Sequence, residues 1–317
     1  MVKIYLELLC VAVFASKMPC YHPITAYRTI APDHAGKHNI AFKPHTDSVE
    51  LQLPCGRCIG CRLQRSKQWA IRCVHEASLY EENCFLTLTY SDEHLPFDES
   101  INVKHIQKFI KRLRKKYPGK TIRYFHCGEY GEDNRRPHYH ICLFNFDFHH
   151  KDLWSDRNDI KLYTSEELQS LWPYGHSTIG ELTFDSAAYV ARYITKKING
   201  EQAEEHYQHV TRYGELVQLQ PEYITMSRRP GIASGWYDKY KTDVYPHDYV
   251  IHRGLKLKPP KFYDNLYDID HPFSFDEIKE KRVNDGYQFS QDTTPERLHV
   301  REKIKQLKKI PRSYECK

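Results

Sequence analysis

Hydrophobic side chains recur at helical and strand spacing through the middle of the chain. Apolar residues three or four positions apart predict helices over residues 62–80 and 102–117. Short apolar runs that end at polar turns instead predict strands. We expect strands at residues 84–90, 121–131, 138–146 and 176–184. Further helices are expected near residues 165–172, 185–198, 274–285 and 294–309.

The order of these elements predicts the fold class. A strand and a basic helix are followed by two strands that a polar loop joins, and then by another strand and helix. This order is typical of an α+β fold with an antiparallel sheet, and we expect the helices to pack on one face of it. Along the chain we expect a leader or a mis-set start at 1–19, a Cys-rich region with a basic helix at 20–82, a core at 83–200 and a C-terminal extension at 201–317.

Composition narrows the class of protein. Hydrophobic residues make up 40% of the 317 positions, so the chain can bury a core. No apolar run reaches the roughly 20 residues that a membrane-spanning helix needs, which argues against a membrane protein. The 47 Lys and Arg outnumber the 41 Asp and Glu, which gives a net charge of +6. This excess is small, so nucleic-acid binding depends on where the basic residues cluster.

Three of the ten cysteines stand close together in the segment CGRCIGC. This spacing is suited to thiolate ligands of a structural zinc ion, which would stabilise the N-terminal region. Cys55, Cys58 and Cys61 supply three ligands, and Cys20 is the preferred fourth, ahead of Cys73 or a nearby histidine. Three free thiols in a turn and an iron–sulfur cluster are the alternatives.

The segment RPHYHICLF contains two histidines that point the same way in a strand. His138 and His140 are two positions apart, and alternate side chains of a strand share a face. Glu129 ends the preceding strand, so an antiparallel hairpin brings it beside them, and two imidazoles with one carboxylate suit a divalent cation. The alternatives are ordinary strand histidines and a surface glutamate, with Glu132 and Asp133 as weaker substitute ligands.

The segment YVARYITKK places two tyrosines on one side of the last core helix. Tyr189 and Tyr193 are four residues apart, with Lys196 between them in angle and Lys197 alongside. The apolar stripe of this helix lies on its other side. A phenol is a poor nucleophile near pH 7 because its pKa is near 10. A cation that polarises a phosphate and a lysine that favours the developing charge would make it competent.

Together these motifs resemble the HUH superfamily of single-strand endonucleases, which is named for two histidines around a bulky residue. The chain is more closely similar to the replication initiators of microviruses, the small icosahedral single-stranded DNA phages, and of their gokushovirus branch. The resemblance covers roughly residues 20–240, and its motifs are FLTLTY, GEYG with RPHYHICLF, YVARYITKK, and MSRRPG at 226–231. The early CGRCIGC and the basic helix after it are also similar to that branch.

The resemblance implies an HUH endonuclease core with a ferredoxin- or RRM-like sheet. Glu129, His138 and His140 would hold Mg²⁺ or Mn²⁺ against the scissile phosphate. One tyrosine would attack, leaving a 5′-phosphotyrosyl enzyme and a free 3′-OH that primes rolling-circle synthesis, and the other tyrosine would later rejoin the strand. Lys196 or Lys197 would stabilise the transition-state charge, and we prefer Lys196 for its angle.

The same resemblance implies the partners and the place of action. The chain would bind single-stranded DNA and the replication origin, work with the host helicase and polymerase, and act in the host bacterial cytoplasm. Basic side chains on the helix at 102–117, beside the histidine hairpin and in MSRRPG could neutralise phosphates. They are Lys108, Lys111, Arg112, Lys115, Arg135, Arg136, Arg228 and Arg229. For the helix, a solvated basic face is the alternative.

Three other functions fit parts of the pattern. A plasmid initiator, relaxase or transposase would use the same chemistry, although the tyrosine pair argues against single-tyrosine transposases and the cysteines favour the phage branch. A non-catalytic zinc-containing nucleic-acid-binding protein would need only the cysteines. A metal-dependent hydrolase that activates water would cleave DNA without a covalent protein–DNA link.

Overall fold

The computed structural model describes residues 20–34, 38–131, 134–157, 160–192 and 202–308. The chain forms two compact units: one contains the described residues up to Arg65 and from Lys241 onward, and the other is Ser66–Tyr240. The expected leader or mis-set start at 1–19 lies outside the described residues. Among the helices that the structure describes, none is long and apolar enough to cross a membrane.

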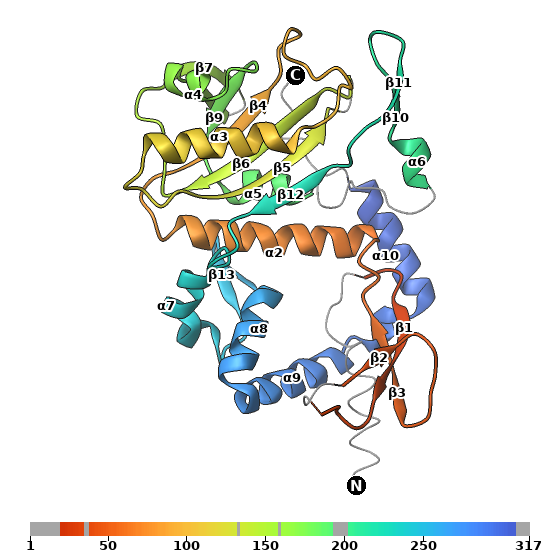
Figure 1. Ribbon diagram of the computed structural model, residues 1–317. Coiled ribbons are helices and arrows are strands. Elements are labelled where there is room, and N and C mark those ends of the chain that lie inside the picture. Colours follow the sequence, from red (N-terminus) through yellow and green to blue (C-terminus); the bar gives the residue numbers. More distant parts are fainter. Residues whose placement is uncertain (1–19, 35–37, 132–133, 158–159, 193–201, 309–317) are drawn as a thin grey trace. The chain divides into compact units, whose positions relative to one another are not determined.

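The larger unit, Ser66–Tyr240, is built around a seven-stranded sheet with the order β12-β5-β6-β4-β9-β8-β7 (Figure 1). Every neighbouring pair in this sheet is antiparallel, which confirms the predicted α+β class. The strands are β4 (Asn83–Thr89), β5 (Arg123–Tyr130), β6 (Pro137–Phe144), β7 (Asp152–Arg157), β8 (Ile160–Thr164), β9 (Ser177–Gly180) and β12 (Tyr223–Met226).

Helix α3 (Val103–Lys116) covers one face of the sheet (Figure 1). Its start is fixed by the side chain of Asn102, which accepts a hydrogen bond from a backbone N–H of the first turn. Its buried stripe packs against alternate residues of β4 and β6 in a single hydrophobic core, completed by α4 (Glu166–Leu171) and Trp172. The core residues from α3, β4 and β6 are Ile106, Phe109, Ile110, Leu113, Leu86, Leu88, Ile141 and Leu143.

Two further helices lie on the opposite face, which corrects the prediction that helices pack on one face. In α2 (Ile59–Ala77), Trp69 stacks on Phe125 of β5 with ring centroids 4.9 Å apart. Helix α5 (Phe184–Arg192) contacts β5 and β6. The reason is that the central strands are buried on both faces: all five residues from Cys84 to Leu88 are buried. Such strands need cover on both sides.

The predicted elements of the core are all present, within a few residues of their expected ends. For the helix expected at 185–198, the structure describes α5 as far as Arg192, and residues 193–198 lie outside the described part. The sequence did not predict β12, the β7–β8 hairpin, or the small elements between α5 and β12. These are α6 (Gln202–His206), β10 (Gln208–Val210) and β11 (Leu216–Gln218).

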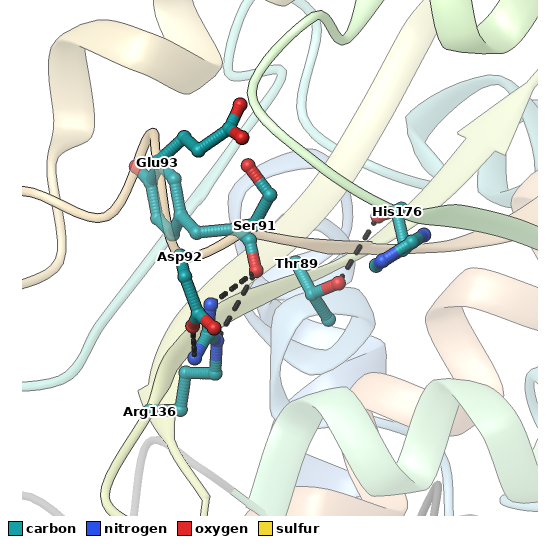
Figure 2. A pocket seen from close by; sticks show the side chains of 7 residues that line it. Thr89, Ser91, Asp92, Glu93, Arg136 and His176 are labelled. Atoms are coloured by element: carbon teal, nitrogen blue, oxygen red, sulfur yellow. Dashed lines mark hydrogen bonds and ion pairs between the residues drawn. The ribbon is translucent and has the colours of Figure 1, made fainter.

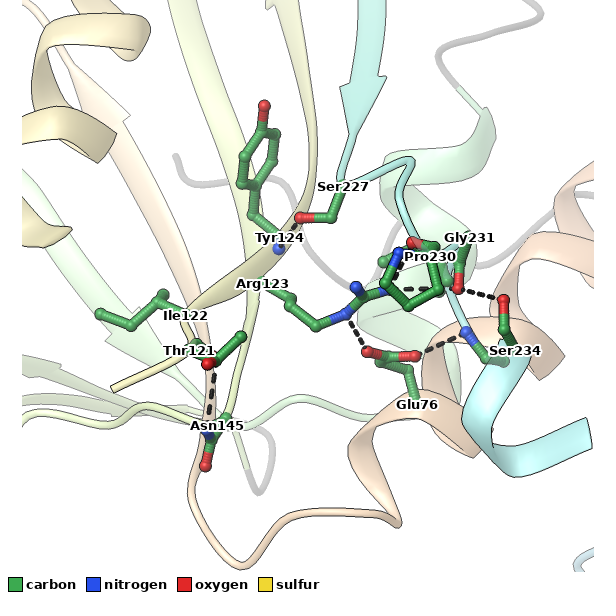
Figure 3. A network of polar contacts seen from close by, with 12 residues as sticks. Glu76, Thr121, Ile122, Arg123, Tyr124, Asn145, Ser227, Pro230, Gly231 and Ser234 are labelled. Carbon is green, nitrogen blue, oxygen red and sulfur yellow. Dashed lines mark hydrogen bonds and ion pairs between the residues drawn. The ribbon is translucent and has the colours of Figure 1, made fainter. Parts of the chain in front are cut away.

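A buried ion pair anchors the segment MSRRPG behind the sheet (Figure 3). Arg123 of β5 donates to Glu76 of α2, and these side chains are only 8% and 2% exposed. The same guanidinium donates to the carbonyl oxygens of Pro230 and Gly231, at 3.0 and 3.1 Å. Glu76 in turn accepts a hydrogen bond from the backbone N–H of Ala233. One charged pair therefore ties three separate segments together.

The other unit combines an N-terminal sheet with C-terminal helices. Its sheet has the order β2-β1-β3 and few buried side chains. In the C-terminal part, Arg282 pairs with both Asp248 and Asp264. The strands are β1 (Ile24–Thr29), β2 (Ile40–Ala41), β3 (Ser48–Leu53), β13 (Val250–His252) and β14 (Leu255–Leu257). The helices are α7 (Ser234–Val244), which crosses the boundary between the units, α8 (Lys261–Asp270), α9 (Pro272–Tyr287), the short η2 (Ser290–Thr293) and α10 (Pro295–Leu307).

Candidate active site

The two histidines and the glutamate of the predicted metal site lie side by side on β5 and β6. Glu129 is directly opposite His138 in the register of these strands, and Cys127 is opposite His140. Because His138 and His140 are two residues apart, both rings lie on the face that carries Glu129. Nε2 of His138 is 2.8 Å from Oε1 of Glu129, and Nε2 of His140 is 2.7 Å from the same oxygen.

The other nitrogen of each ring is held by a hydrogen bond from behind. Nδ1 of His138 is 3.1 Å from the backbone oxygen of Arg136. A carbonyl oxygen only accepts, so this Nδ1 carries the proton. Nδ1 of His140 hydrogen-bonds to Oγ1 of Thr87 at 3.0 Å, in a buried position. Both Nε2 atoms are thereby directed at the carboxylate, which is how metal-binding histidines are usually oriented.

Glu129 is a buried carboxylate with spare ligand capacity. Its exposed fraction is 1%. Burial raises its pKa, but the hydrogen bonds and charges of His138 and His140 outweigh that effect, and the pKa is lowered below the usual range. Its second oxygen, Oε2, is buried and accepts no hydrogen bond from the residues that the structure describes.

The donor set of Glu129, His138 and His140 fits a divalent cation. One ligand atom from each of these three residues lies within 4.8 Å of the others. Two imidazole nitrogens and a carboxylate bind Mn²⁺ and similar ions, and leave coordination positions open for phosphate or water. A cation at this point would also satisfy Oε2, which the fold buries. These residues could therefore hold a divalent metal ion.

Tyr189 reaches the same point from α5. Its hydroxyl donates to Oε1 of Glu129 at 3.4 Å, and its ring packs edge-on against His140 with centroids 5.0 Å apart. Helix α5 is tied to α2 by Ser66, whose hydroxyl donates to the backbone oxygen of Ala188 at 2.8 Å. Tyr189 is 7% exposed, so it is buried against the site although it does not belong to the apolar stripe.

The second tyrosine and both lysines of the predicted machinery cannot be placed in the same way. Tyr193, Lys196 and Lys197 lie outside the described residues. Their roles stay predictions. The weaker substitute ligands Glu132 and Asp133 lie outside the described residues as well.

A polar pocket of about 620 Å³ opens next to the histidine pair (Figure 2). Thr89 lines it and is opposite His138 in the register of β4 and β6. Arg136 lines it too, donating to the backbone oxygen of Tyr90 and pairing with Asp92 at 2.7 Å. The full lining is Thr89, Tyr90, Ser91, Asp92, Glu93, Arg136 and His176.

The predicted DNA-binding residues lie in several different places. Lys108, Lys111 and Lys115 are exposed on α3, which covers the face of the sheet opposite the histidine pair. Arg112 is half-buried with its guanidinium 5.8 Å from the centre of the Tyr174 ring. In the histidine hairpin, Arg135 donates to the backbone oxygen of His206, and Arg136 lines the pocket. Arg228 and Arg229 are exposed after β12. DNA contact at all of these stays a prediction.

The four predicted zinc ligands come together in the smaller unit. The sulfur atoms of Cys20, Cys55, Cys58 and Cys61 all lie within 4.8 Å of one another. Burial raises the pKa of the Cys58 thiol, but backbone N–H groups that donate to its sulfur outweigh that effect and lower the pKa to about 7. Cys73, the substitute fourth ligand, is instead fully buried in the larger unit.

Sequence reasoning missed the residues behind and beside the histidines. Thr87 holds His140, and Thr89 lines the pocket, yet neither received a role. The signal for them was the alternation in FLTLTY, where two threonines share one face of an otherwise apolar strand. Polar residues at alternate positions of a buried strand mark a face that carries polar chemistry. The pocket had no such signal, because its lining comes from separate loops.

Known proteins match this chain over the same region. Residues 83–198 match the family model for replication-associated proteins of the ORF2 type. The chain is 38% identical to replication-associated protein ORF2 of Spiroplasma virus 4 over 249 residues, which are 74% of each chain. It is 33% identical to replication-associated protein VP4 of Bdellovibrio phage phiMH2K over 267 residues, which are 80% of this chain and 79% of the relative.

A third relative, replication-associated protein ORF4 of Chlamydia phage 1, is 36% identical over 154 residues, 46% of this chain and 38% of its own length. No solved structure matches the chain significantly. The antiparallel sheet and the order of the motifs agree with the sequence matches and confirm the resemblance to initiators of microvirus-type phages. The chain is therefore a member of the family of phage replication-associated proteins.

Proposed function

We propose that this chain is the replication initiator endonuclease of a small single-stranded DNA phage, and that it nicks and rejoins DNA through a tyrosine. One observation carries the proposal: Nε2 of His138, Nε2 of His140 and the hydroxyl of Tyr189 all converge on Oε1 of Glu129. A nucleophile beside a set of metal-ligand side chains is the arrangement that phosphodiester transesterification requires.

Glu129, His138 and His140 would hold Mg²⁺ or Mn²⁺. A cation bound there would polarise an oxygen of the scissile phosphate and offset the charge of the transition state. The protein's own contribution is orientation. Arg136 and Thr87 fix the two rings through Nδ1, so Nε2 of each ring is presented to the site without rearrangement.

Tyr189 is the nucleophile for which the geometry gives direct support. Its phenolic oxygen would form a bond to phosphorus while the bond from phosphorus to the 3′ oxygen breaks. The phenol loses its proton, and the 3′ oxygen leaves as a hydroxyl. Atoms balance without water, and the energy of the phosphodiester is kept in the tyrosyl link, so rejoining needs no ATP. The Glu129 carboxylate, which accepts from the phenol, orients the attacking oxygen.

Tyr193 would carry out the second transesterification after one round of synthesis, and Lys196 or Lys197 would offset charge on the phosphate. Two tyrosines one helical turn apart can alternate at one metal site, because the strand passed to the second tyrosine stays within reach of the same ligands. The 3′-OH released at the first step would be extended by the host polymerase, with host helicase opening the duplex in the bacterial cytoplasm.

The pocket beside the histidine pair would receive the nucleotide next to the scissile phosphate. Its polar lining and the guanidinium of Arg136 fit a nucleotide better than an apolar ligand. The exposed cations Arg228 and Arg229 would contact phosphates farther along the strand.

The direct test is the fate of each end of a cleaved strand. A single-stranded origin oligonucleotide carries one label at its 5′ end and another at its 3′ end, and is incubated with protein and Mn²⁺. We expect the 3′ label to migrate with the protein on a denaturing gel, and the 5′-labelled fragment to be extendable by a polymerase. EDTA should abolish both products.

Matched variants separate the possible chemistries. The Tyr189→Phe/Tyr193→Phe double variant should lose the adduct and still bind Mn²⁺ and DNA, while Tyr213→Phe, at an exposed tyrosine, should behave as the wild type. Cleavage without any protein-bound label would identify water as the nucleophile. DNA binding with neither cleavage nor adduct would identify a non-catalytic binding protein.

A further inference from the structure

The four clustered thiols join segments that are separate in the sequence. Cys20 precedes β1, Cys55 and Cys58 follow β3, and Cys61 lies in the first turn of α2. Sulfur atoms around a tetrahedral zinc ion lie about 3.8 Å apart, given a Zn–S distance of about 2.3 Å. The sulfurs of Cys55 and Cys61 are 4.0 Å apart, and all four lie within 4.8 Å. This spacing suits a single ion; a cluster of several irons with bridging sulfides holds its thiolates farther apart.

Backbone N–H groups are directed at these sulfur atoms. The N–H of Tyr21 donates to Sγ of Cys58, that of Cys55 donates to Sγ of Cys20, and that of Cys58 donates to Sγ of Cys55, each at 3.3 Å. Donors around sulfur stabilise the thiolate, which is the form that binds metal. The turn that carries the cysteines is therefore preorganised for charged sulfur rather than for neutral thiols.

The sheet next to the cysteines has almost no hydrophobic core. Within the sheet β2-β1-β3 only Ala26 and Leu51 are buried. The hydrophobic cluster at this end of the sheet consists of the cysteines themselves with Tyr21 packed against them. Small modules that bury so little apolar surface usually need a metal or disulfides to be stable. The described cysteines form no disulfide.

We infer that Cys20, Cys55, Cys58 and Cys61 bind one zinc ion, which fastens both ends of the N-terminal sheet to the start of α2. The ion is structural: four protein sulfurs fill a tetrahedral site and leave no position open for substrate. This inference does not depend on the nicking reaction, because the ligands belong to the smaller unit and the candidate active site to the larger one.

The first test measures metal in the full chain after purification without added metal. To keep the active site from contributing, the measurement uses the His138→Ala/His140→Ala double variant beside the wild type. We expect one zinc per chain in both. Replacing zinc by Co²⁺ should give the absorption of a tetrahedral thiolate site, with intense sulfur-to-cobalt charge-transfer bands. No bound metal in a folded chain, or iron with acid-labile sulfide, would overturn the inference.

A second test uses ligand variants and a matched cysteine. Cys58→Ser and Cys61→Ser should each lose the zinc and make residues 20–58 sensitive to protease. Cys73→Ala changes a buried cysteine farther along the same helix and should keep one zinc per chain. Full retention of zinc by both serine variants would place the ion elsewhere and contradict the assignment. The wild-type metal content decides the matter even where a variant fails to fold.

Discussion

At the residue scale, the chemistry centres on one oxygen of Glu129. Two imidazole nitrogens lie 2.8 and 2.7 Å from it, and the phenol of Tyr189 lies 3.4 Å away. Because Nδ1 of His138 already donates to a carbonyl, contact between its Nε2 and the carboxylate requires a proton or a cation between them. A divalent ion can replace those protons, and metal binding then releases them to solvent.

Thr87 supplies the first prediction at this scale. Its hydroxyl is the partner of Nδ1 of His140, so Thr87→Val leaves the ring without its orienting hydrogen bond. We expect the affinity for Mn²⁺ to fall by about 10- to 100-fold, the usual effect of removing such a supporting group. Isothermal titration calorimetry measures it. Thr89→Val, on the same strand and face, should leave Mn²⁺ affinity unchanged; an equal fall in both variants would show that the Thr87 hydroxyl has no special role.

At the element scale, the predicted parts are those with a clear periodicity. Strands β4, β5 and β6 are long and apolar, and α3 has a regular buried stripe, so local pattern and tertiary burial agree. Strand β12 was missed because it has four half-buried residues, and pairing with β5 rather than its own sequence makes it a strand. Strand β7 was missed because its side chains are mostly exposed and show no alternation.

The candidate site was predictable for the same reason. A two-residue period puts His138 and His140 on one face, and a short hairpin brings Glu129 opposite, so three ligands follow from local rules. The pocket does not follow from such rules. Its lining joins β4, the residue before β6 and the residue before β9, and only the order of strands in the sheet brings these together.

The ion pair between α2 and β5 gives a prediction for these elements. Glu76→Gln removes the charge that compensates the buried Arg123 and weakens the hydrogen bond from the backbone of Ala233. We expect the free energy of unfolding to fall by about 3–5 kcal/mol, because a buried charge is left without its partner. Denaturation by urea measures the change.

The control for that prediction is a surface pair. Glu82 pairs with Lys120, and about a third of each side chain is exposed. Glu82→Gln should therefore change the free energy of unfolding by less than about 1 kcal/mol. A change of similar size in the two variants would show that the buried pair does not hold α2 to the sheet.

At the scale of the larger unit, the two faces of the sheet differ in character. One face carries the histidine pair, Glu129 and Tyr189, and the other carries α3 with its exposed lysines. The lysines therefore cannot touch the phosphate that Tyr189 attacks. If they bind DNA, they bind a part of the strand that has passed around the edge of the sheet, and their contribution is electrostatic.

This separation predicts how charge removal changes binding but not chemistry. The triple variant Lys108→Gln/Lys111→Gln/Lys115→Gln should weaken binding of single-stranded DNA and lower the slope of log K against log salt by about 2, at roughly 0.7 for each phosphate that a lysine neutralises. Fluorescence anisotropy at several salt concentrations measures the slope. The amount of covalent adduct at saturating DNA should not change.

A matched variant removes three exposed lysines from α10 and the residue after it. Lys303→Gln/Lys305→Gln/Lys308→Gln alters the net charge equally, and we expect the salt slope to stay at the wild-type value. The same slope in all three proteins would show that the basic face of α3 is only solvated. Equal reductions in both variants would show a general effect of net charge.

The central claim is that a tyrosine of α5 becomes linked to DNA, and peptide mass spectrometry tests it most directly. Trypsin cuts after Arg192, so Tyr189 falls in the peptide 162–192 and Tyr193 in the peptide 193–196. After reaction with Mn²⁺ and digestion of the DNA to a nucleotide remnant, we predict a nucleotide mass on Tyr189, and its transfer to peptide 193–196 in Tyr189→Phe. Cleaved DNA without a nucleotide on either peptide would contradict the account.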